Sequence, residues 1–355
     1  MKIAVVDLVS LDGGGYQVTK SLFQYATTGN GKLHQWLFIV SKQKFESTKS
    51  VKVVKFPEGS EGYGKRAITE ITKVKKCLKE YGADVIVSMS NMGVIGCNLK
   101  QIIYLQQSIP FQKEKKFSFF KKEESRYAFR QYIQGWFIKK SIKNARAVLV
   151  QTNWVREEVQ KVSRKTPVIN IGYPAENKSR EHKVRANNVS TDFFYPCGPA
   201  IYKNLSVVVK AVNCLIKKGM KFKFYVTLTR EEMQELTSER VIAPDVFQYL
   251  GRISPEEVAK KYVESTLVFA SYIETLGLPL VEAREAGTWI IASNCAFSHE
   301  VLDDYPNRDY FDPFDEVDLM RKMEAVLEGK KSLKQYEIRS LENCCWDKMV
   351  TAIQK

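Results

Sequence analysis

Two glutamates stand eight positions apart in this sequence, Glu274 and Glu282. The segment that they enclose has the residue types best suited to binding a ligand and to chemistry. An apolar strand pattern from Leu267 to Ser271 precedes the segment, and Pro279 suits the first turn of a following helix. Gly277 would let a ligand approach the backbone closely. The free N–H groups at the start of that helix favour an anion such as a diphosphate. Glu282 is then placed to accept hydrogen bonds from a ribose diol, and Glu274 to accept them from sugar hydroxyls.

The same residues also allow a plainer interpretation. Glu274 would cap the helix, and Glu282 would be a surface carboxylate; the charge pattern alone favours neither. Lys203, taken by itself, is more simply a surface lysine before a helix. The run Gly13 to Gly15 is either a flexible turn or a point where the backbone comes close to a diphosphate or an acceptor.

The elements that must position these residues alternate between apolar strand patterns and helical patterns. The first series includes strands at Ile3 to Val9, Trp36 to Val40 and Val148 to Gln151. After a polar stretch at 176–190, a second series begins with a strand at Phe193 to Pro196. Such alternation predicts α/β architecture with two doubly wound parallel sheets. Ligands of these sheets bind outside the carboxyl ends of the strands.

Composition limits the functional class and the compartment. A chain of 355 residues is long for one core, so two domains are expected. The sequence contains no apolar run long enough for a spanning helix and no signal-peptide pattern, and its cysteines form no framework; these features predict a cytoplasmic protein. The net charge of +15 favours an anionic partner. The His and Cys residues are too scattered for a structural zinc site.

Several motifs together resemble family 4 glycosyltransferases, including enzymes of capsule and O-antigen polysaccharide synthesis. The segment from Glu274 to Ala283 is similar to the E-x7-E signature of that family, with Leu276 where an aromatic residue is usual. The supporting motifs are Val150-Gln151-Thr152-Asn153-Trp154, Tyr195-Pro196, Tyr202-Lys203-Asn204, Tyr249-Leu250-Gly251, Glu300-Val301-Leu302 and Tyr310-Phe311-Asp312.

The resemblance implies a GT-B fold, in which two Rossmann-like domains face a cleft. Residues 1–170 would form the acceptor-binding domain, 171–190 a linker, and 191–335 the nucleotide-sugar-binding domain. A C-terminal helix at 336–355 would return to the first domain. The implied donor site consists of Gly14, Gly15, Lys203, Asn204, Gly251, Arg252, Glu274, Leu276, Gly277, Leu278 and Glu282.

The implied reaction is a retaining, metal-independent transfer of a hexosyl or related group from a nucleoside diphosphate sugar to a saccharide. Glu274, Lys203 and Gln106 take the catalytic roles, and no cofactor is expected beyond the co-substrate. Two departures from the family pattern stand out. Residues Cys197 to Ala200 lack the usual Arg, and Gln106 replaces a His; a Gln side chain cannot act as a general base. A non-catalytic relative that binds a nucleotide or a partner enzyme is therefore the alternative.

The segment from Lys113 to Lys143 combines ten basic with three acidic residues, a net charge of +7, and interleaves them with aromatics. This pattern favours an anionic membrane surface on the inner face of the plasma membrane, where a lipid-linked acceptor would lie. A helix pair with solvated lysines is the plainer alternative, and nucleic acid is not the partner we expect. The proposed membrane or acceptor patch is Lys115, Lys116, Phe119, Phe120, Lys121 and Lys122.

Overall fold

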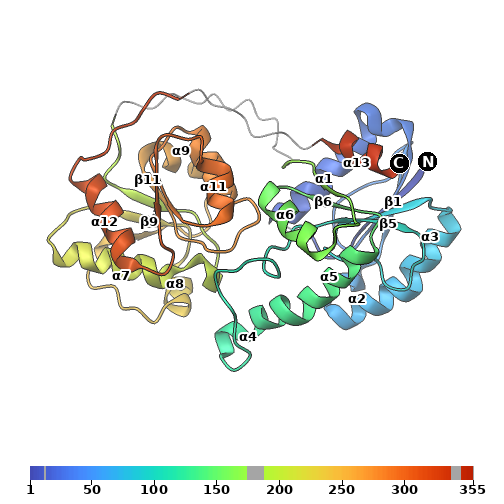
Figure 1. Ribbon diagram of the computed structural model, residues 1–355, viewed down its shortest axis with the longest axis horizontal. Helices are drawn as coiled ribbons and strands as arrows, with labels where there is room; N and C mark the ends of the chain where they lie inside the picture. Colours follow the sequence, from blue (N-terminus) through green and yellow to red (C-terminus); the bar gives the residue numbers. More distant parts are fainter. Residues whose placement is uncertain (12, 174–187, 337–344, 355) are drawn as a thin grey trace. The chain divides into compact units, whose positions relative to one another are not determined.

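The computed structural model describes residues 1–11, 13–173, 188–336 and 345–354 (Figure 1). Contacts divide the chain into two compact units. The first holds Met1–Phe111, Arg126–Asn177 and Glu342–Lys355, and the second holds Gln112–Ser125 and Lys178–Leu341. The first unit is therefore not the continuous 1–170 stretch that we expected, because Gln112–Ser125 groups with the second unit. Most of the expected linker, residues 174–187, lies outside the described residues.

The first unit is built on a parallel sheet of seven strands. In spatial order these are β3 (Val51–Lys55), β2 (Gln35–Val40), β1 (Lys2–Asp7), β4 (Val85–Ser88), β5 (Lys100–Tyr104), β6 (Ala147–Val150) and β7 (Val168–Asn170). Its helical segments are α1 (Gly13–Thr27), η1 (Gly29–Leu33), η2 (Pro57–Ser60), α2 (Tyr63–Thr69), η3 (Glu70–Val74), α3 (Lys75–Tyr81), η4 (Phe129–Gln134), α5 (Gly135–Asn144), α6 (Asn153–Val162) and α13 (Trp346–Gln354). Helix α4 (Lys122–Ala128) spans the boundary between the units.

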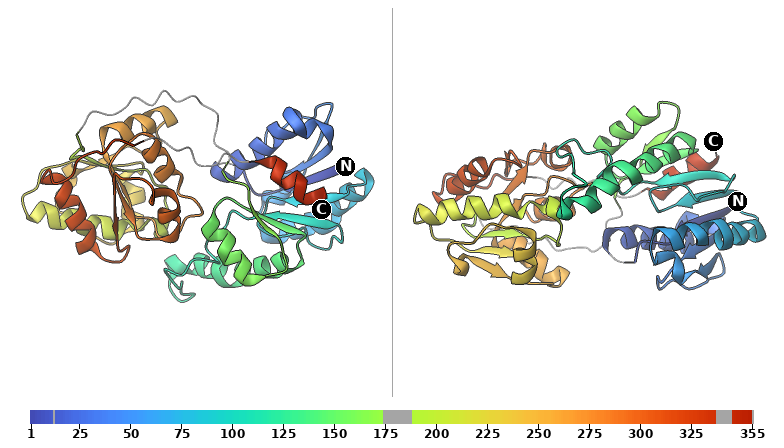
Figure 2. Two further views of the ribbon diagram at one scale, coloured as in Figure 1. Left: turned by 45° about the horizontal axis from the view of Figure 1, so that its top comes forward. Right: turned by 90° about the horizontal axis from the view of Figure 1, so that it is seen from below.

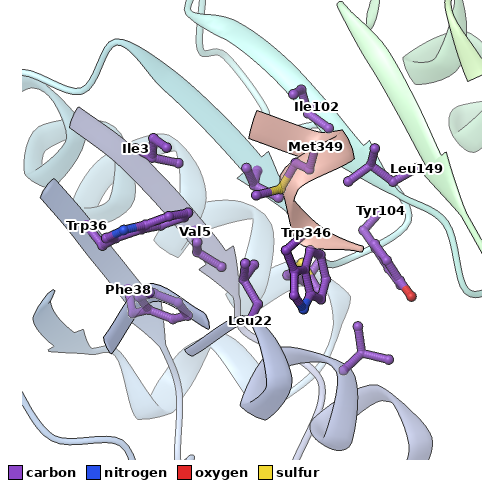
Figure 3. Packing of buried hydrophobic residues seen from close by; sticks show 14 of the residues in the cluster. Ile3, Val5, Leu22, Trp36, Phe38, Ile102, Tyr104, Leu149, Trp346 and Met349 are labelled. Atoms are coloured by element: carbon purple, nitrogen blue, oxygen red, sulfur yellow. The ribbon is translucent and has the colours of Figure 1, made fainter. Parts of the chain in front are cut away.

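Both faces of this sheet are covered, which explains why its strands are apolar on both sides. Along β1, Ile3 and Val5 point into a core shared with α1 and α13, whereas Ala4 and Val6 point into a core shared with α3. Figure 3 shows the first of these cores, with Trp346 lying beside Tyr104. The strands are therefore held between two layers of helices.

Helix α13 packs against the first unit, next to α1 in Figures 1 and 2. Trp346 Nε1 donates a hydrogen bond to Ser21 Oγ at 3.0 Å, and the Trp346 side chain is 4% exposed. Tyr25 donates to Asp347 at 2.7 Å. The C-terminal helix that we expected at 336–355 is shorter among the described residues, because residues 336 and 345 are not helical and α13 begins at Trp346.

The second unit contains a parallel sheet of six strands. In spatial order these are β10 (Phe247–Tyr249), β9 (Phe224–Val226), β8 (Phe193–Tyr195), β11 (Thr266–Phe269), β12 (Ile290–Ser293) and β13 (Arg308–Phe311). Its helical segments are η5 (Ile201–Lys203), α7 (Leu205–Lys217), α8 (Arg230–Leu236), η6 (Pro244–Val246), α9 (Pro255–Glu264), α10 (Leu278–Glu285), α11 (Ala296–Leu302) and α12 (Glu316–Leu327). Ser254 caps α9, because its side chain accepts from the Glu257 N–H in a capping box.

Each sheet has a point at which the direction of strand order reverses. In the first sheet, β1 continues to β2 on one side, while its other neighbour, β4, continues to β5. In the second sheet, β8 and β11 are neighbours whose successors lie on opposite sides. A crevice for ligands forms outside the carboxyl ends of strands at such reversals. The loops after β1, β8 and β11 are therefore where binding residues are expected.

Candidate functional site

The loops that leave β8 and β11 bring two of the predicted catalytic side chains together. Lys203 ends the short η5 helix after β8, and Glu274 follows β11. Lys203 Nζ donates a short hydrogen bond to Glu274 Oε1, although the two residues are separated by 71 positions in the sequence. The pair therefore lies at the strand-order reversal of the second sheet, where a ligand is expected.

The surroundings of Lys203 keep this lysine charged. Its side chain is 15% exposed, and that of Glu274 is 19% exposed. Burial alone would lower the pKa of Lys203, but the nearby Glu274 carboxylate outweighs it, so the pKa is raised. The ammonium group also lies over the rings of Tyr202 and Phe269, at 5.5 and 5.8 Å from their centroids. Lys203 is therefore a shielded cation at neutral pH.

The backbone around Lys203 is fixed by contacts at both sides. The Tyr195 hydroxyl donates to the Lys203 carbonyl at 2.9 Å. The next residue, Asn204, has a left-handed backbone with φ of 61°, and its side-chain nitrogen donates to the Pro313 carbonyl at 2.5 Å. Asn204 thus anchors the turn that leads into α7, a role that sequence reasoning did not assign to it.

The start of α10 has the geometry that the glycine and proline predicted. Gly277 is the N-cap residue, with φ of 77°, and Pro279 lies in the first turn. A β-carbon at Gly277 would lie 3.3 Å from Leu280 Cδ1 and 3.4 Å from Phe297 Cδ2, so a larger residue would be crowded as well as strained. Leu276 is buried, 7% exposed, and Leu278 begins the helix. Because the first N–H groups of a helix have no intrahelical partner, this start favours an anion.

Glu282 lies one turn into α10 and is held by α9. The buried Tyr262 hydroxyl donates to Glu282 Oε2 at 3.0 Å. This hydrogen bond fixes one carboxylate oxygen, and a carboxylate can accept several hydrogen bonds. Sequence reasoning missed Tyr262, because its distance of 20 positions from Glu282 gives no local signal.

Positive charge at the neighbouring loops comes from Arg230 and Arg252. Gly251 follows β10 with φ of 61°, and Arg252 next to it is exposed. Arg230, after β9, lies over the Tyr249 ring at 5.5 Å from its centroid. Both arginines therefore stand at the carboxyl edge of this sheet. Arg230 was not among the predicted residues.

The stretch without the usual Arg is a structural turn. The Cys197 N–H donates to Thr227 Oγ1 at 2.8 Å, and the Thr227 hydroxyl donates back to the Cys197 carbonyl at 3.0 Å. Burial raises the pKa of the Cys197 thiol to about 12, so the thiol is neutral at physiological pH. This side chain contributes no charge for an anionic ligand.

In the first unit, the structure corrects the expected glycine turn. Helix α1 begins at Gly13, so Gly14 and Gly15 lie in its first turn rather than in a turn before the helix. A β-carbon at Gly15 would lie 3.0 Å from Ser10 Oγ and 3.2 Å from Gln106 Oε1, whereas one at Gly14 would meet no atom within 4 Å. Gly15 and Gln106 are thus neighbours at the strand-order reversal of the first sheet.

Two polar side chains, the half-buried Asn91 and the buried Asp7, shape this edge of the first unit. Asn91 has φ of 65°, and its Oδ1 accepts from the Gln106 and Gln107 N–H groups at 2.6 and 2.9 Å. Asp7, at the end of β1, accepts from the Val9 and Ser10 N–H groups at 3.2 and 3.0 Å. Burial raises the pKa of Asp7 despite these bonds. Asp7 therefore organises the loop between β1 and α1, which sequence reasoning did not anticipate.

The predicted membrane patch is partly engaged in internal contacts. Lys115 and Lys121 lie 3.0 and 3.7 Å from a carboxylate oxygen of the buried Glu124. Phe120 is fully exposed, and Phe119 is about half exposed. Lys116 and Lys122 are exposed as well.

The described residues contain neither a membrane-spanning helix nor a metal-binding cluster. None of the described helices is both long and apolar enough to cross a membrane. Within the same residues, no group of three or more His, Cys, Asp or Glu side chains could hold a metal ion.

Comparison with known proteins gives a family match in the second half of the chain. Residues 191–341 match the family described as glycosyl transferases group 1. The match includes Lys203, Glu274, Gly277 and Glu282, and glycosyl transfer is the class of activity that it supports. No curated protein matches the sequence.

Solved glycosyltransferase structures share the architecture of the chain. Sucrose-phosphate synthase from Thermosynechococcus elongatus is 16% identical with a TM-score of 0.64, and the match covers 92% of this chain and 90% of that one. WaaG, a glycosyltransferase involved in lipopolysaccharide biosynthesis, is 15% identical with a TM-score of 0.64, covering 92% and 91%. HepE from Anabaena, in complex with UDP and glucose, is 16% identical with a TM-score of 0.59, covering 93% and 90%. At this level of identity the likeness shows the GT-B fold.

Proposed function

We propose that the chain transfers a hexosyl or related group, with retention of anomeric configuration, from a nucleoside diphosphate sugar to a saccharide acceptor. The observation that carries the proposal is the shielded Lys203–Glu274 pair at the strand-order reversal of a group 1 glycosyltransferase domain. A shielded cation whose only carboxylate partner among the described residues is Glu274 suits a ligand that brings additional negative charge. A diphosphate is such a ligand.

Each part of the donor then has a complementary group. The diphosphate lies at the N-terminus of α10, with Lys203 as its cation. Glu282, fixed by Tyr262, accepts from the ribose diol. Glu274 accepts from hydroxyls of the sugar, and Gly277 lets the backbone approach without a side chain. HepE was solved with UDP and glucose, which supports a donor of this class.

The transfer breaks the bond between the anomeric carbon and the diphosphate oxygen and forms a bond from the acceptor oxygen to that carbon. Negative charge develops on the departing diphosphate, where Lys203 and the α10 N–H groups stabilise it. Gln106 cannot take the acceptor proton at neutral pH. We therefore assign that proton to an oxygen of the departing diphosphate.

We propose that the reaction needs no metal, because the Lys203 ammonium and the helix N–H groups supply positive potential at the leaving group. Turnover of the matching sugar nucleotide should be the same in excess EDTA as in Mg²⁺. A loss of turnover in EDTA that Mg²⁺ restores would overturn this part of the proposal.

We further propose that the acceptor is lipid-linked and belongs to bacterial surface polysaccharide synthesis, at the cytoplasmic face of the plasma membrane. WaaG acts in lipopolysaccharide biosynthesis, which supports this setting. The exposed Lys116, Phe119, Phe120 and Lys122 would contact the membrane or the acceptor. The basic character of the chain suits anionic lipid.

Thermal unfolding in the presence of UDP, GDP and CDP tests the donor site. We expect one nucleotide to raise the unfolding temperature and Glu282→Ala to abolish that increase. Glu264→Ala, which changes an exposed carboxylate of α9, is the matched control. If none of the nucleotides stabilises the protein, the proposed donor site is wrong.

A non-catalytic relative that binds a nucleotide or a partner enzyme is the second candidate. The observations that favour it are Gln106 at the expected His position and a turn without Arg at Cys197. Incubation with a panel of sugar nucleotides separates the two candidates. An enzyme releases nucleoside diphosphate from the matching donor, whereas a relative without activity binds the nucleotide and releases none.

A further inference from the structure

The helical segment from Phe129 to Phe137 exposes an unusual number of large apolar side chains. Phe129, Tyr132, Ile133, Trp136 and Phe137 are between 38% and 57% exposed. Segment η4 is a π-helix that continues into α5, and the shared exposure of these five side chains places them on its solvent side. Scattered exposed apolar residues are common, but a contiguous set marks an interaction surface. We call these five residues the aromatic strip.

The opposite face of the same helix is occupied. Ile138 and Ile142 are fully buried, and both belong to the core beneath β6. A β-carbon at Gly135 would lie 3.0 Å from Pro110 Cβ, so the helix packs closely there. The aromatic strip is therefore the outward side of a helix that is already fixed to the first unit.

Helix α2 extends the apolar surface. The Tyr63 ring lies 5.7 Å from the Phe129 ring, centroid to centroid, and Tyr63 is about half exposed. The surface thus includes residues that lie 66 positions apart in the sequence. A local amphipathic pattern alone would not have joined them.

The charges along the helix are of one sign. From Arg126 to Asn144 the sequence has five basic residues, Arg126, Arg130, Lys139, Lys140 and Lys143, and no acidic residue. Arg126 precedes the aromatic strip, whereas Lys140 and Lys143 follow it, and all three are exposed. Lys140 Nζ lies 5.1 Å from the Trp136 ring centroid, so its aliphatic stem runs along the apolar surface.

We infer that the aromatic strip, with Tyr63 and the flanking basic residues, is the surface by which the first unit inserts into an anionic lipid bilayer. This inference rests on the peripheral-membrane part of the proposed function, but it places the main contact on η4 and α5 rather than on Lys115 to Lys122. Trp and Tyr side chains prefer the headgroup region, where one end of the ring is apolar and the other wet. Lysines beside them reach the anionic headgroups.

Charge decides between a bilayer and a second copy of the chain. In a symmetric dimer the same patch would meet itself, so the basic residues of one copy would face those of the other. Such like-charge contacts disfavour association. An anionic bilayer offers the opposite charge along the whole strip together with an apolar interior, so it fits both features.

Vesicle co-sedimentation of the full chain tests the inference. The vesicles are pure phosphatidylcholine or phosphatidylcholine with phosphatidylglycerol. We expect the wild type to partition onto the anionic vesicles alone. In the triple variant Phe129→Ser/Ile133→Ser/Trp136→Ser the partition coefficient should fall at least about tenfold, because three apolar side chains that insert into the bilayer are removed. The matched control is Leu33→Ser/Ile242→Ser/Val317→Ser, which changes three apolar residues exposed elsewhere and should partition as the wild type does.

A second pair of variants isolates the charge. Lys140→Gln/Lys143→Gln should weaken partitioning onto anionic vesicles by roughly twenty-fivefold, since each lysine near the surface contributes about fivefold. Lys44→Gln/Lys49→Gln, which removes two exposed lysines elsewhere, should weaken it much less. Circular dichroism and the temperature shift produced by nucleotide verify that each variant is folded and that its donor site is intact.

Two outcomes would overturn the inference. The wild type could stay in solution with anionic vesicles, or the triple variant could partition as the wild type does. In the second case, loss of a wild-type dimer or of binding to single-stranded DNA in the triple variant would identify another occupant of the surface. None of these outcomes depends on the nucleotide response of the wild type, so failure of the donor-site proposal is recognised separately.

Discussion

Lys203 and Glu274 form an ion pair that is largely shielded from water, and this shielding gives the lysine its proposed effect. Charges interact more strongly where water is excluded. We predict that Lys203→Ala lowers the turnover number for the matching sugar nucleotide by about a hundredfold, the size typical of removing one group that stabilises a developing oxyanion. Initial rates of nucleoside diphosphate release measure the effect.

A second ion pair in the same unit provides the control. Lys331 lies 2.8 Å from Asp309, with similar shielding, but on another part of the sheet. Lys331→Ala should therefore reduce stability without changing turnover. Equal turnover in Lys203→Ala and the wild type would contradict the role of Lys203 at the leaving group.

Asp7 is a buried carboxyl group whose protonation is linked to stability. Because burial raises its pKa above 3.8 in the folded protein, the folded state binds the proton more tightly than the unfolded state. The free energy of unfolding should therefore fall as pH rises from 3.8 through the raised pKa, by about 1.4 kcal/mol for each unit of the pKa difference.

Asp7→Asn removes this titration and keeps an oxygen for the Val9 and Ser10 N–H groups. We predict that the stability of the wild type relative to this variant decreases between pH 4 and pH 7, as measured by chemical denaturation at each pH. A difference in unfolding free energy that does not change with pH would show that Asp7 titrates normally.

At the scale of elements, the strands were predictable and several helix boundaries were not. Buried parallel strands such as β1 and β11 are short apolar runs, so the sequence reveals them directly. The start of α1 at Gly13 was missed because glycine has a low helix propensity, which packing in the fold overrides. The grouping of Gln112–Ser125 with the second unit depends on tertiary contacts that no local pattern encodes.

The site was predictable to a similar extent. The glycine and proline at the start of α10 carry a local signal, and the resemblance supplied Lys203 and Glu274. The Tyr262–Glu282 hydrogen bond and the position of Arg230 over Tyr249 join separate elements, so they became visible only in the fold.

The N-cap of α10 tests whether crowding at this helix start matters for donor binding. Gly277→Ala should lower the free energy of unfolding by about 1–2 kcal/mol, because alanine is strained in the left-handed backbone at this position. Crowding of the added β-carbon against Leu280 and Phe297 should lower it further. It should also weaken the thermal shift produced by the nucleotide. Gly287→Ala, just beyond the other end of α10, has φ of 71° but no atom near its added β-carbon, and should show the backbone effect alone.

Denaturant midpoints and nucleotide titrations of both variants provide the comparison. If Gly287→Ala weakens nucleotide binding as much as Gly277→Ala does, the effect is a general loss of stability, and the N-terminus of α10 is not the anion site.

At the scale of the whole molecule, the chain passes between the two units four times, yet each unit has its own sheet and its own buried core. Residues Trp346, Met349 and Ile353 complete the core of the first unit, although they lie at the end of the sequence. The proposed donor site, in contrast, lies at the loops after β8 and β11 and at the start of α10, all in the second unit. Stability and donor binding should therefore respond to different substitutions.

We predict that calorimetry resolves two unfolding transitions. The matching nucleotide should raise the unfolding free energy of only one of them, by about 2.7 kcal/mol at a hundredfold excess over its Kd. Trp346→Ala should lower the unfolding free energy of the other transition by about 3–5 kcal/mol, because it removes a large buried side chain from the core of the first unit. Trp136→Ala, at an exposed position, should lower neither. A single transition that responds to both the nucleotide and Trp346→Ala would contradict this prediction. The two cores would then unfold as one cooperative unit, coupled through the four crossings of the chain.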